Sequence, residues 1–238
     1  MNIVDVIVLL LVALFGLYGM KKGLIKTAVS LVGLILVFIL SYLLKDTIAE
    51  WMSLNLPFFN FVGSFKGATI LNVIIYQLIA FFAIFAILMT AYSIVVSISG
   101  LVERILKVTI VLAIPSKIGG FILGVIEGIF VSLIVIIILS LPTLNFDLIR
   151  DSAIRKYLYN ASPIIGNITS NTNDAIDEII ELKDKFENDE DKEEFNISCM
   201  DILLKNKVVK YDYMEKLISS GKLKVDKEKA YEIMNKYK

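Results

Sequence analysis

The chain has 238 residues, 57% of them hydrophobic, and its 24 basic and 24 acidic side chains leave no net charge. With a mean hydropathy of +0.75, this composition is too apolar for an ordinary soluble domain, and the neutral total gives no reason to expect nucleic acid as a partner. The absence of histidine excludes Ser-His-Asp and Cys-His catalysis, and the single cysteine, Cys199, excludes an intrachain disulfide. The sequence has no phosphate loop, dinucleotide fingerprint or metal-ligand spacing, so we expect no catalytic residues, no cofactor and no metal.

Charged side chains are concentrated in the last part of the chain. The first 142 residues carry only 13 of the 48 Asp, Glu, Lys and Arg residues. A stretch of about 20 uncharged apolar residues is long enough, as a helix, to cross a hydrocarbon core about 30 Å thick. Four such stretches predict an all-α polytopic membrane protein with four transmembrane helices and a helical, charged C-terminal tail. The predicted transmembrane domain covers residues 1–142, with spans at about 3–20, 24–44, 70–98 and 118–141.

The second and third connections between the spans have distinct compositions. The connection at 45–68 contains Trp51 and four phenylalanines, and such rings favour the headgroup level, so we expect it to lie along the membrane surface or to dip into it. Residues 101–107 have the spacing of a short interfacial helix. Pro115 is suited to the opening of the fourth span.

The polar tail is predicted to be helical in two parts. Residues 143–194 form an amphipathic and acidic linker region, whose acidic run is most simply a solvated segment. Residues 195–238 form a small helical tail unit, with helix starts near Ser198, Asp212 and Asp226. A three-helix unit of this size is marginally stable without a partner.

Basic residues in the connections indicate the orientation. Lysine and arginine gather at the first and third connections, whereas the second has only Lys45 and Lys66. By the positive-inside rule, the first and third connections are cytoplasmic, and both termini are extracytoplasmic in the inner or plasma membrane. Arg150, Arg155 and Lys156, which follow the fourth span, argue for the opposite orientation.

Small residues recur on one face of the fourth span. Gly120, Gly124 and Gly128 lie four residues apart, and Ser132 continues the row. This spacing allows two helices to approach closely, so we expect the face to pack within the bundle or in a homo-oligomer; the other interpretation is a pore-lining or substrate-facing groove. Gly23, in the very short turn after the first span, is a further candidate for close packing.

Three charged residues in or beside the spans are candidates for a functional role. Glu127 lies about 15 Å into the fourth span, counted from Lys117, and an ionisable group at that depth is expected to be neutral, paired or in a wet cavity. Lys26 lies in the first turn of the second span, where its side chain can reach the interface. Asp5 lies at the outer end of the first span, where a favourable interaction with the helix dipole is a simpler role than catalysis.

Two segments resemble the colicin V production protein (CvpA) family. They are Val4-Asp5-Val6-Ile7, followed by the run from Gly19 to Leu31, and Pro115 to Gly120 with the glycines that follow. The resemblance covers roughly residues 1–160, and its motifs lie in the expected order within a four-span layout. Family members often have a basic-acidic pair where this chain has Lys26-Thr27, and a basic residue where it has Glu127. An ion pair between Lys26 and Glu127 is therefore a hypothesis for this chain.

The resemblance implies a small bacterial inner-membrane protein, associated with toxin (bacteriocin) production or export and with envelope homeostasis. Some relatives carry an extracytoplasmic trypsin-like protease after the spans, but the tail of this chain lacks histidine, so that chemistry does not carry over. We expect a non-enzymatic accessory or scaffold protein in the lipid bilayer, whose tail contacts an envelope or secreted protein. The alternative is a small transporter or channel subunit that uses the glycine face of the fourth span and Glu127.

Overall fold

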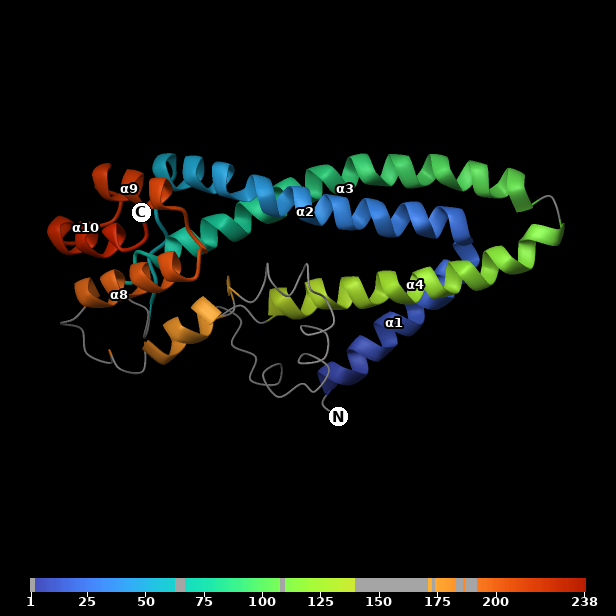
Figure 1. Cartoon of the computed structure of the whole chain (residues 1–238), viewed down its shortest axis with the longest axis horizontal. Coiled ribbons are helices and arrows are strands. Elements are labelled where there is room, and N and C mark those ends of the chain that lie inside the picture. The colour runs from blue at the N-terminus through green and yellow to red at the C-terminus, as the bar shows by residue number, and fades with distance from the viewer. Residues whose placement is uncertain are drawn as a thin grey trace. The chain divides into compact units, whose positions relative to one another are not determined.

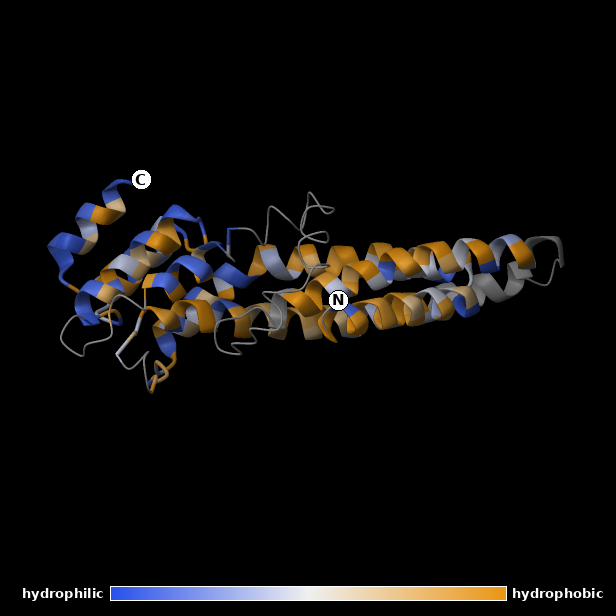
Figure 2. Cartoon of the chain, turned by 90° about the horizontal axis from the view of Figure 1, so that it is seen from below, coloured by the Kyte–Doolittle hydropathy of each residue, from blue (hydrophilic) through white to orange (hydrophobic). Residues whose placement is uncertain are grey.

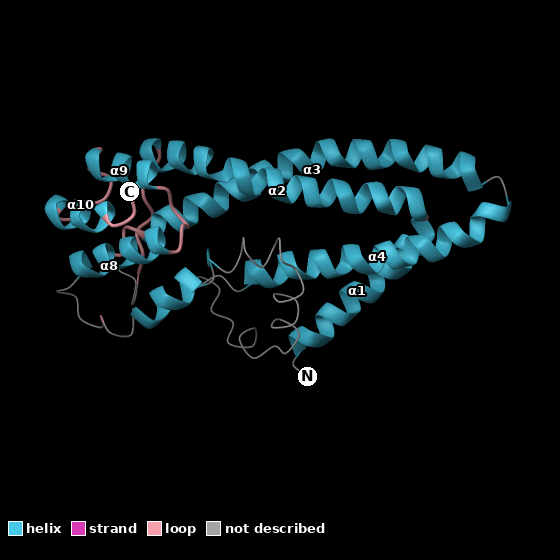
Figure 3. Cartoon of the chain, viewed as in Figure 1, coloured by secondary structure: helices cyan, strands magenta, loops and turns pink. Residues whose placement is uncertain are grey.

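The structure is a computed structural model of the whole chain. It describes residues 3–62, 67–107, 110–139, 171–172, 174–182, 186 and 192–238, and for residues 98–107, 110–113 and 137–139 it describes the backbone alone. All regular secondary structure in these ranges is helical, which confirms the predicted all-α class (Figure 3). Most of the expected linker region at 143–194 lies outside the described residues.

Four long helices form the apolar part of the chain (Figure 1). They are α1 (Ile3–Lys22), α2 (Leu24–Asn55), α3 (Leu71–Lys107) and α4 (Ile110–Leu139). Each contains an apolar segment long enough to cross a membrane, and Figure 2 shows hydrophobic residues along most of their described length. The chain is therefore a multi-pass membrane protein with four spans, as predicted.

Two of these helices extend further than the predicted spans. α2 continues to Asn55 and takes up the first half of the connection expected at 45–68, and α3 runs unbroken to Lys107, so it includes the interfacial helix expected at 101–107. The 32 residues of α2 and the 37 of α3 correspond to about 48 Å and about 56 Å of helix, against a hydrocarbon core of about 30 Å. Both helices are therefore long enough to project beyond the hydrocarbon core.

Pro115 lies inside α4 rather than at its start. The helix begins at Ile110, so the proline occupies its sixth position. Without an N–H group, Pro115 leaves the carbonyl four residues earlier without its helical hydrogen bond. The helix therefore starts earlier than predicted, although its apolar span, Ile114–Ile136, begins beside Pro115.

The helices contribute to two compact units. The bundle unit comprises residues 1–41 and 85–166, and the tail unit comprises residues 42–84 and 167–238. The bundle unit contains α1, α4, the first part of α2 and the last part of α3. The tail unit contains the rest of α2 and α3, together with the C-terminal helices α8 (Lys192–Lys205), α9 (Tyr211–Ser219) and α10 (Lys227–Asn235). These units differ from the domains predicted with boundaries at residues 142 and 194. The reason is that the C-terminal helices pack against parts of α2 and α3.

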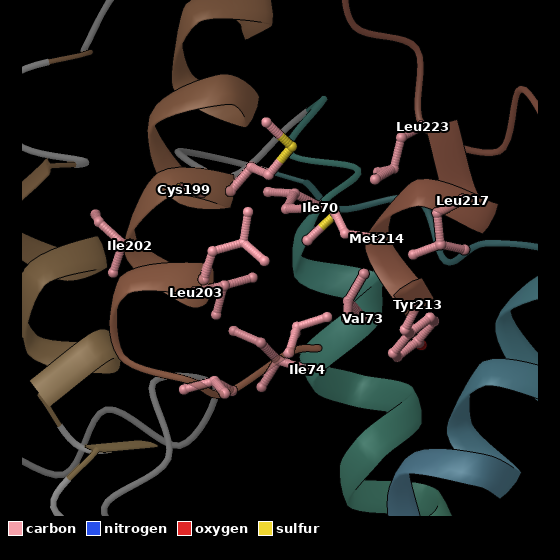
Figure 4. Close-up of a cluster of buried hydrophobic side chains, with 14 of the residues drawn as sticks. Ile70, Val73, Ile74, Cys199, Ile202, Leu203, Tyr213, Met214, Leu217 and Leu223 are labelled. Atoms are coloured by element: carbon pink, nitrogen blue, oxygen red, sulfur yellow. The ribbon is translucent and has the colours of Figure 1, made fainter. Parts of the chain in front are cut away.

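The tail unit has a hydrophobic core of its own. Ile70 and Val73, at the start of α3, are almost inaccessible and belong to one cluster with Leu203 of α8 and Met214 of α9 (Figure 4). The three C-terminal helices would be only marginally stable alone. In the structure, they bury their apolar faces against α2 and α3. Of the helix starts expected from the sequence, Asp226 caps α10 by accepting a hydrogen bond of 3.0 Å from the N–H of Lys229.

Ser198 does not start a helix, because it lies in the middle of α8, which begins at Lys192. Asn196, two residues before Ser198, is already within α8 and is buried. Its side-chain oxygen accepts a hydrogen bond of 3.0 Å from the N–H of Ile70, and its amide donates to the carbonyl of Gly67 at 3.0 Å. The early start of α8 therefore places a side chain that caps the beginning of α3.

Candidate functional site

The glycine face of α4 packs against α1. A methyl group added at Gly120 would collide with the backbone carbonyl of Gly19, and one added at Gly124 would collide with that of Phe15. A Cβ atom at Gly128 would meet the α1 backbone at 2.9 Å. Backbone atoms cannot move aside as a flexible side chain can, so this helix separation requires glycine. The row of small residues is a helix-packing surface, and α1 covers it at these three glycines.

Gly23 forms the turn between α1 and α2. Its φ of 89° lies in the left-handed region that favours glycine. Its N–H donates a hydrogen bond of 2.9 Å to the carbonyl of Gly19, and its own carbonyl accepts one of 2.7 Å from the hydroxyl of Thr27. A Cβ atom at Gly120 would lie 2.9 Å from the carbonyl carbon of Gly23. Gly23 therefore serves both the reversal of the chain and the close contact with α4.

The beginning of α2 is held by a side chain of α4. The hydroxyl of Ser116 accepts a hydrogen bond of 3.1 Å from the N–H of Leu24, the first residue of α2, across 92 positions of sequence. This N–H is among the four that a helix start leaves without an internal partner, so Ser116 caps α2 from another helix. The two segments that carry the family resemblance, around Gly23 and around Ser116, therefore meet in the structure.

A buried polar cluster lies inside the bundle unit, and we call its four residues, Lys22, Ser30, Tyr92 and Glu127, the Glu127 cluster. Glu127 is only 4% exposed and lies near the middle of the apolar segment Ile114–Ile136 of α4. The Ser30 hydroxyl donates a hydrogen bond of 2.6 Å to Glu127 Oε1, and Lys22 Nζ lies 3.8 Å from the same oxygen. Glu127 is thus paired, one of the three states expected from its depth.

Hydroxyl groups complete the Glu127 cluster. Lys22 Nζ donates a hydrogen bond of 3.1 Å to Ser30 Oγ, so the serine bridges the lysine and the carboxylate. The Tyr92 hydroxyl, from α3, lies 2.7 Å from Ser30 Oγ and 3.1 Å from the Ser30 carbonyl oxygen. All four helices of the bundle unit therefore contribute one residue each. In a low-dielectric environment, a carboxylate with these partners avoids the cost of an unpaired buried charge.

Glu127 pairs with Lys22 in the structure and not with Lys26, the partner expected from the sequence. Lys22 is the last residue of α1, and its long side chain reaches inward to the carboxylate with only 12% of its surface exposed. The hypothesis of a pair with Lys26 followed the family's basic-acidic pair, which corresponds to Lys26-Thr27 in this chain. The signal for Lys22 is its position directly before the Gly23 turn, because that turn brings the end of α1 against α2 and α4.

The remaining candidate residues lie apart from this pair or beside it. Asp5 is in the first turn of α1 and is 1% exposed. It is seventeen residues from Lys22, which is about 26 Å along the helix axis, so it does not belong to the Glu127 cluster. Lys26 lies in the first turn of α2 and is half-buried.

Ser30 and Lys22 have the pairing of a serine–lysine catalytic dyad, a hydroxyl within hydrogen-bond distance of an amine. A nucleophile must also be accessible to a substrate and able to transfer its proton to the base. Ser30 is 0% exposed, and its hydroxyl hydrogen is directed to Glu127. The geometry is therefore that of a structural ion pair with a bridging hydroxyl.

The four apolar helices and the buried ion pair within them define an α-helical, multi-pass membrane protein. The chain belongs to the colicin V production protein family, since the sequence model of that family matches residues 4–163, more than half of its 238 residues. This confirms the resemblance found in the sequence. Comparisons with curated proteins and with solved structures found no match.

The family match covers the residues that build the site. Both the Gly23 turn and the Ser116 cap lie within residues 4–163, as do the four members of the Glu127 cluster. The helices α8, α9 and α10 lie beyond the match. The family thus accounts for the bundle unit and its internal contacts, whereas the C-terminal helices of the tail unit are a feature of this chain outside the family model.

Proposed function

We propose that this protein is a non-enzymatic scaffold or accessory factor of the cell membrane that supports toxin production or export and envelope homeostasis. The observation that carries the proposal is that Glu127 and the three glycines of the α4 face are all engaged in contacts inside the bundle unit. Glu127 is held by Ser30 and Lys22, and the glycine face of α4 is filled by α1. A bundle built in this way supports and positions the other parts of the protein.

The alternative, a small transporter or channel subunit, has less support. That function requires a path along the glycine face with Glu127 accessible from it. In the described helices, added methyl groups at Gly120 and Gly124 would strike the backbone of α1, and Glu127 is 4% exposed. A conformational change would have to separate α1 from α4 before either feature reached a solute.

The surface for a protein partner is, in this proposal, the outer face of α9 and α10. Their inner faces are buried in the tail unit, at Leu217 and Met234 for example, and their outer faces carry exposed charges of both signs, such as Glu215 and Lys229. Mixed charge favours a specific protein surface over a uniformly anionic membrane or nucleic acid. We propose an extracytoplasmic location for this surface, based on the lysines and arginines of the first and third connections.

The proposal is tested by photo-crosslinking in cells that produce the toxin. A photoreactive amino acid is placed at Glu215 or Lys229, with Leu14, an exposed apolar position of α1, as the matched control. We expect crosslinks to an envelope or secreted protein from the two tail positions and only to lipid from Leu14. Charge-reversal at the crosslinking positions is expected to reduce toxin export without reducing the amount of protein in the membrane.

A flux assay tests the transporter alternative directly. The full chain is reconstituted in vesicles, and the uptake of candidate ions and small solutes is measured for the wild type and for Glu127→Gln. The scaffold proposal expects no flux above that of empty vesicles. Solute uptake that depends on Glu127, in a variant that still folds, would contradict it and favour the transporter alternative.

A further inference from the structure

The α2 and α3 helices run beside each other in the bundle unit (Figure 1). An open apolar groove lies between them, lined by α2 residues between Ala28 and Val37 and by α3 residues between Leu88 and Val95, and its volume is about 560 Å³. Tyr92 is the one lining side chain with a polar group, and its hydroxyl is engaged by Ser30. The groove therefore offers an occupant hydrocarbon contacts and no free hydrogen-bonding group of its own.

The length and the apolar walls of the groove suit lipid acyl chains. Its α2 wall spans nine residue steps, or about 14 Å, which is close to the thickness of one leaflet of a hydrocarbon core of about 30 Å. Acyl chains that enter from one leaflet would therefore contact the walls over the whole length of the groove, and they need no hydrogen-bonding group from it.

The width of the groove depends on small residues. Gly33 lies on its floor, where an added Cβ atom would be 2.7 Å from the ring of Tyr92. Ala28 and Ala91 line the same groove with side chains of one carbon. Larger side chains at these places would fill the space between the helices. The small side chains of the walls thus leave space for an occupant between α2 and α3.

Positive charge lies at the end of the groove nearest the Gly23 turn. Lys26 precedes Ala28 by two residues and lies on the same helical face as Val29 and Gly33, which line the groove. Lys21 and Lys117 are exposed near the same turn, where Ser116 meets Leu24. Lys22 pairs with Glu127 beside the same turn. Four lysines, at positions 21, 22, 26 and 117, therefore accompany the one carboxylate of Glu127 among these described side chains.

We propose that this groove binds an anionic phospholipid, with its two acyl chains between α2 and α3 and its phosphate beside Lys26. The chains enter from the leaflet that contains the Gly23 turn. Basic pockets between membrane helices recognise anionic headgroups in this way, because the lysine attracts the phosphate while the apolar walls hold the chains. The site is separate from the partner surface proposed for the tail unit.

The test counts the lipids that remain bound to the purified full chain. The protein is equilibrated with phosphatidylglycerol or with phosphatidylethanolamine of the same chain length, extracted in a delipidating detergent and weighed by native mass spectrometry. We expect one phosphatidylglycerol to be retained in preference to the zwitterionic lipid. Lys26→Gln should reduce this preference by roughly fivefold, as for the loss of one lysine near an anionic lipid, and Lys26→Arg should keep it.

A second test compares a variant that fills the groove with a control variant that leaves it open. Ala91→Trp places a large side chain at an exposed position of the groove wall, and Ile94→Trp places the same side chain on α3 at an exposed position outside it. We expect Ala91→Trp to lose the bound phosphatidylglycerol and Ile94→Trp to retain it, with both proteins eluting as folded species. Val32→Phe, at a second exposed position of the wall, replaces Ala91→Trp if that variant does not fold.

Several results would overturn the proposal. Equal retention of the two lipids would show that the lysines do not select a headgroup. Equal retention by Ala91→Trp and the wild type would show that the groove does not hold the lipid. Displacement of the lipid by inorganic phosphate would identify a site for a free anion, and release of a co-purified polypeptide by Ala91→Trp would identify a partner helix as the occupant.

Discussion

Lys22, the last residue of α1, forms a buried ion pair with Glu127 in the middle of α4, with 3.8 Å between Nζ and Oε1. The bridging Ser30 hydroxyl connects both side chains. The pair joins the two helices that also share the glycine contact, so charge pairing and close backbone packing act on the same interface. If α1 and α4 were separated in the membrane, the close packing would be lost and each charge would face hydrocarbon without its partner.

We expect Glu127→Gln to destabilise the bundle unit by about 3–5 kcal/mol, because Lys22 would remain buried without its partner. The double variant Lys22→Met/Glu127→Met should cost clearly less than the sum of the single changes, because it removes both charges together. The measurement is thermal unfolding of the detergent-solubilised protein, followed by loss of the monodisperse elution peak. The matched control is Lys26→Gln, and a cost equal to that of Lys22→Gln would support the Lys26 pairing instead.

Gly124→Ala is expected to weaken the contact between α1 and α4. The new methyl group would strike the carbonyl of Phe15, which is backbone and cannot move without shifting the helix. Overpacking of this kind costs about 1–3 kcal/mol. Ile122→Ala, at an exposed position of the same helix, is the control in the same thermal assay. A melting temperature unchanged by Gly124→Ala would contradict the close approach of the two helices.

Tyr213 is expected to make the tail unit sensitive to alkaline pH. Burial raises the pKa of Tyr213 above its usual value of 10.0, while its hydroxyl contacts Ser53 and the carbonyl of Ala49. Because the folded state holds this proton more tightly than the unfolded state, the stability contribution is complete below about pH 10 and decreases above it, by about 1.4 kcal/mol per pH unit.

The test for Tyr213 compares denaturant unfolding at pH 8 and pH 11 for the wild type and Tyr213→Phe. The variant should be less stable at pH 8, by about 1 kcal/mol for its lost hydrogen bonds, and should lose less stability at pH 11. Tyr231→Phe, at a partly exposed side chain of α10, is the control. The same alkaline loss in wild type and Tyr213→Phe would show that other groups cause it.

Cys199 provides a direct measure of opening in the tail unit. Its side chain is 0% exposed, and burial raises the pKa of its thiol, so the reactive thiolate is suppressed in the folded state. We expect a maleimide reagent to label it only when α8 separates from the core. Rapid labelling of the native wild type would contradict the burial of α8 against α3.

Asn196→Ala should accelerate this labelling. The substitution leaves the N–H of Ile70 without its cap, and an unsatisfied buried donor costs about 1–3 kcal/mol, so the labelling rate should rise by roughly tenfold or more. Asn235→Ala, at an exposed position of α10, should label at the wild-type rate. Equal rates for both variants would show that the Asn196 cap does not hold α8 in place.

The spans were predictable because they depend on local composition, whereas the helix ends and partners were not. Hydropathy indicated α2 from residue 24 but ended it at 44, since the burial of Ala49 and Ser53 depends on their contacts with Tyr213 of α9. The row of glycines indicated a packing face without naming its partner. Glu127 was correctly placed within a span, but Lys26 and Lys22 are both close to the same turn, and composition does not distinguish them.

The sequence alone determined the all-α membrane class, the four spans and the family, because bilayer thickness converts the length of an apolar run directly into a crossing. Only the tertiary structure decided that Lys22 pairs with Glu127, that Ser116 caps α2, and that the C-terminal helices pack on α3. These contacts join residues far apart in the sequence, by 126 positions in the bond between Asn196 and Ile70. They depend on the rotation and register of whole helices, which are fixed by packing rather than by any local stretch of sequence.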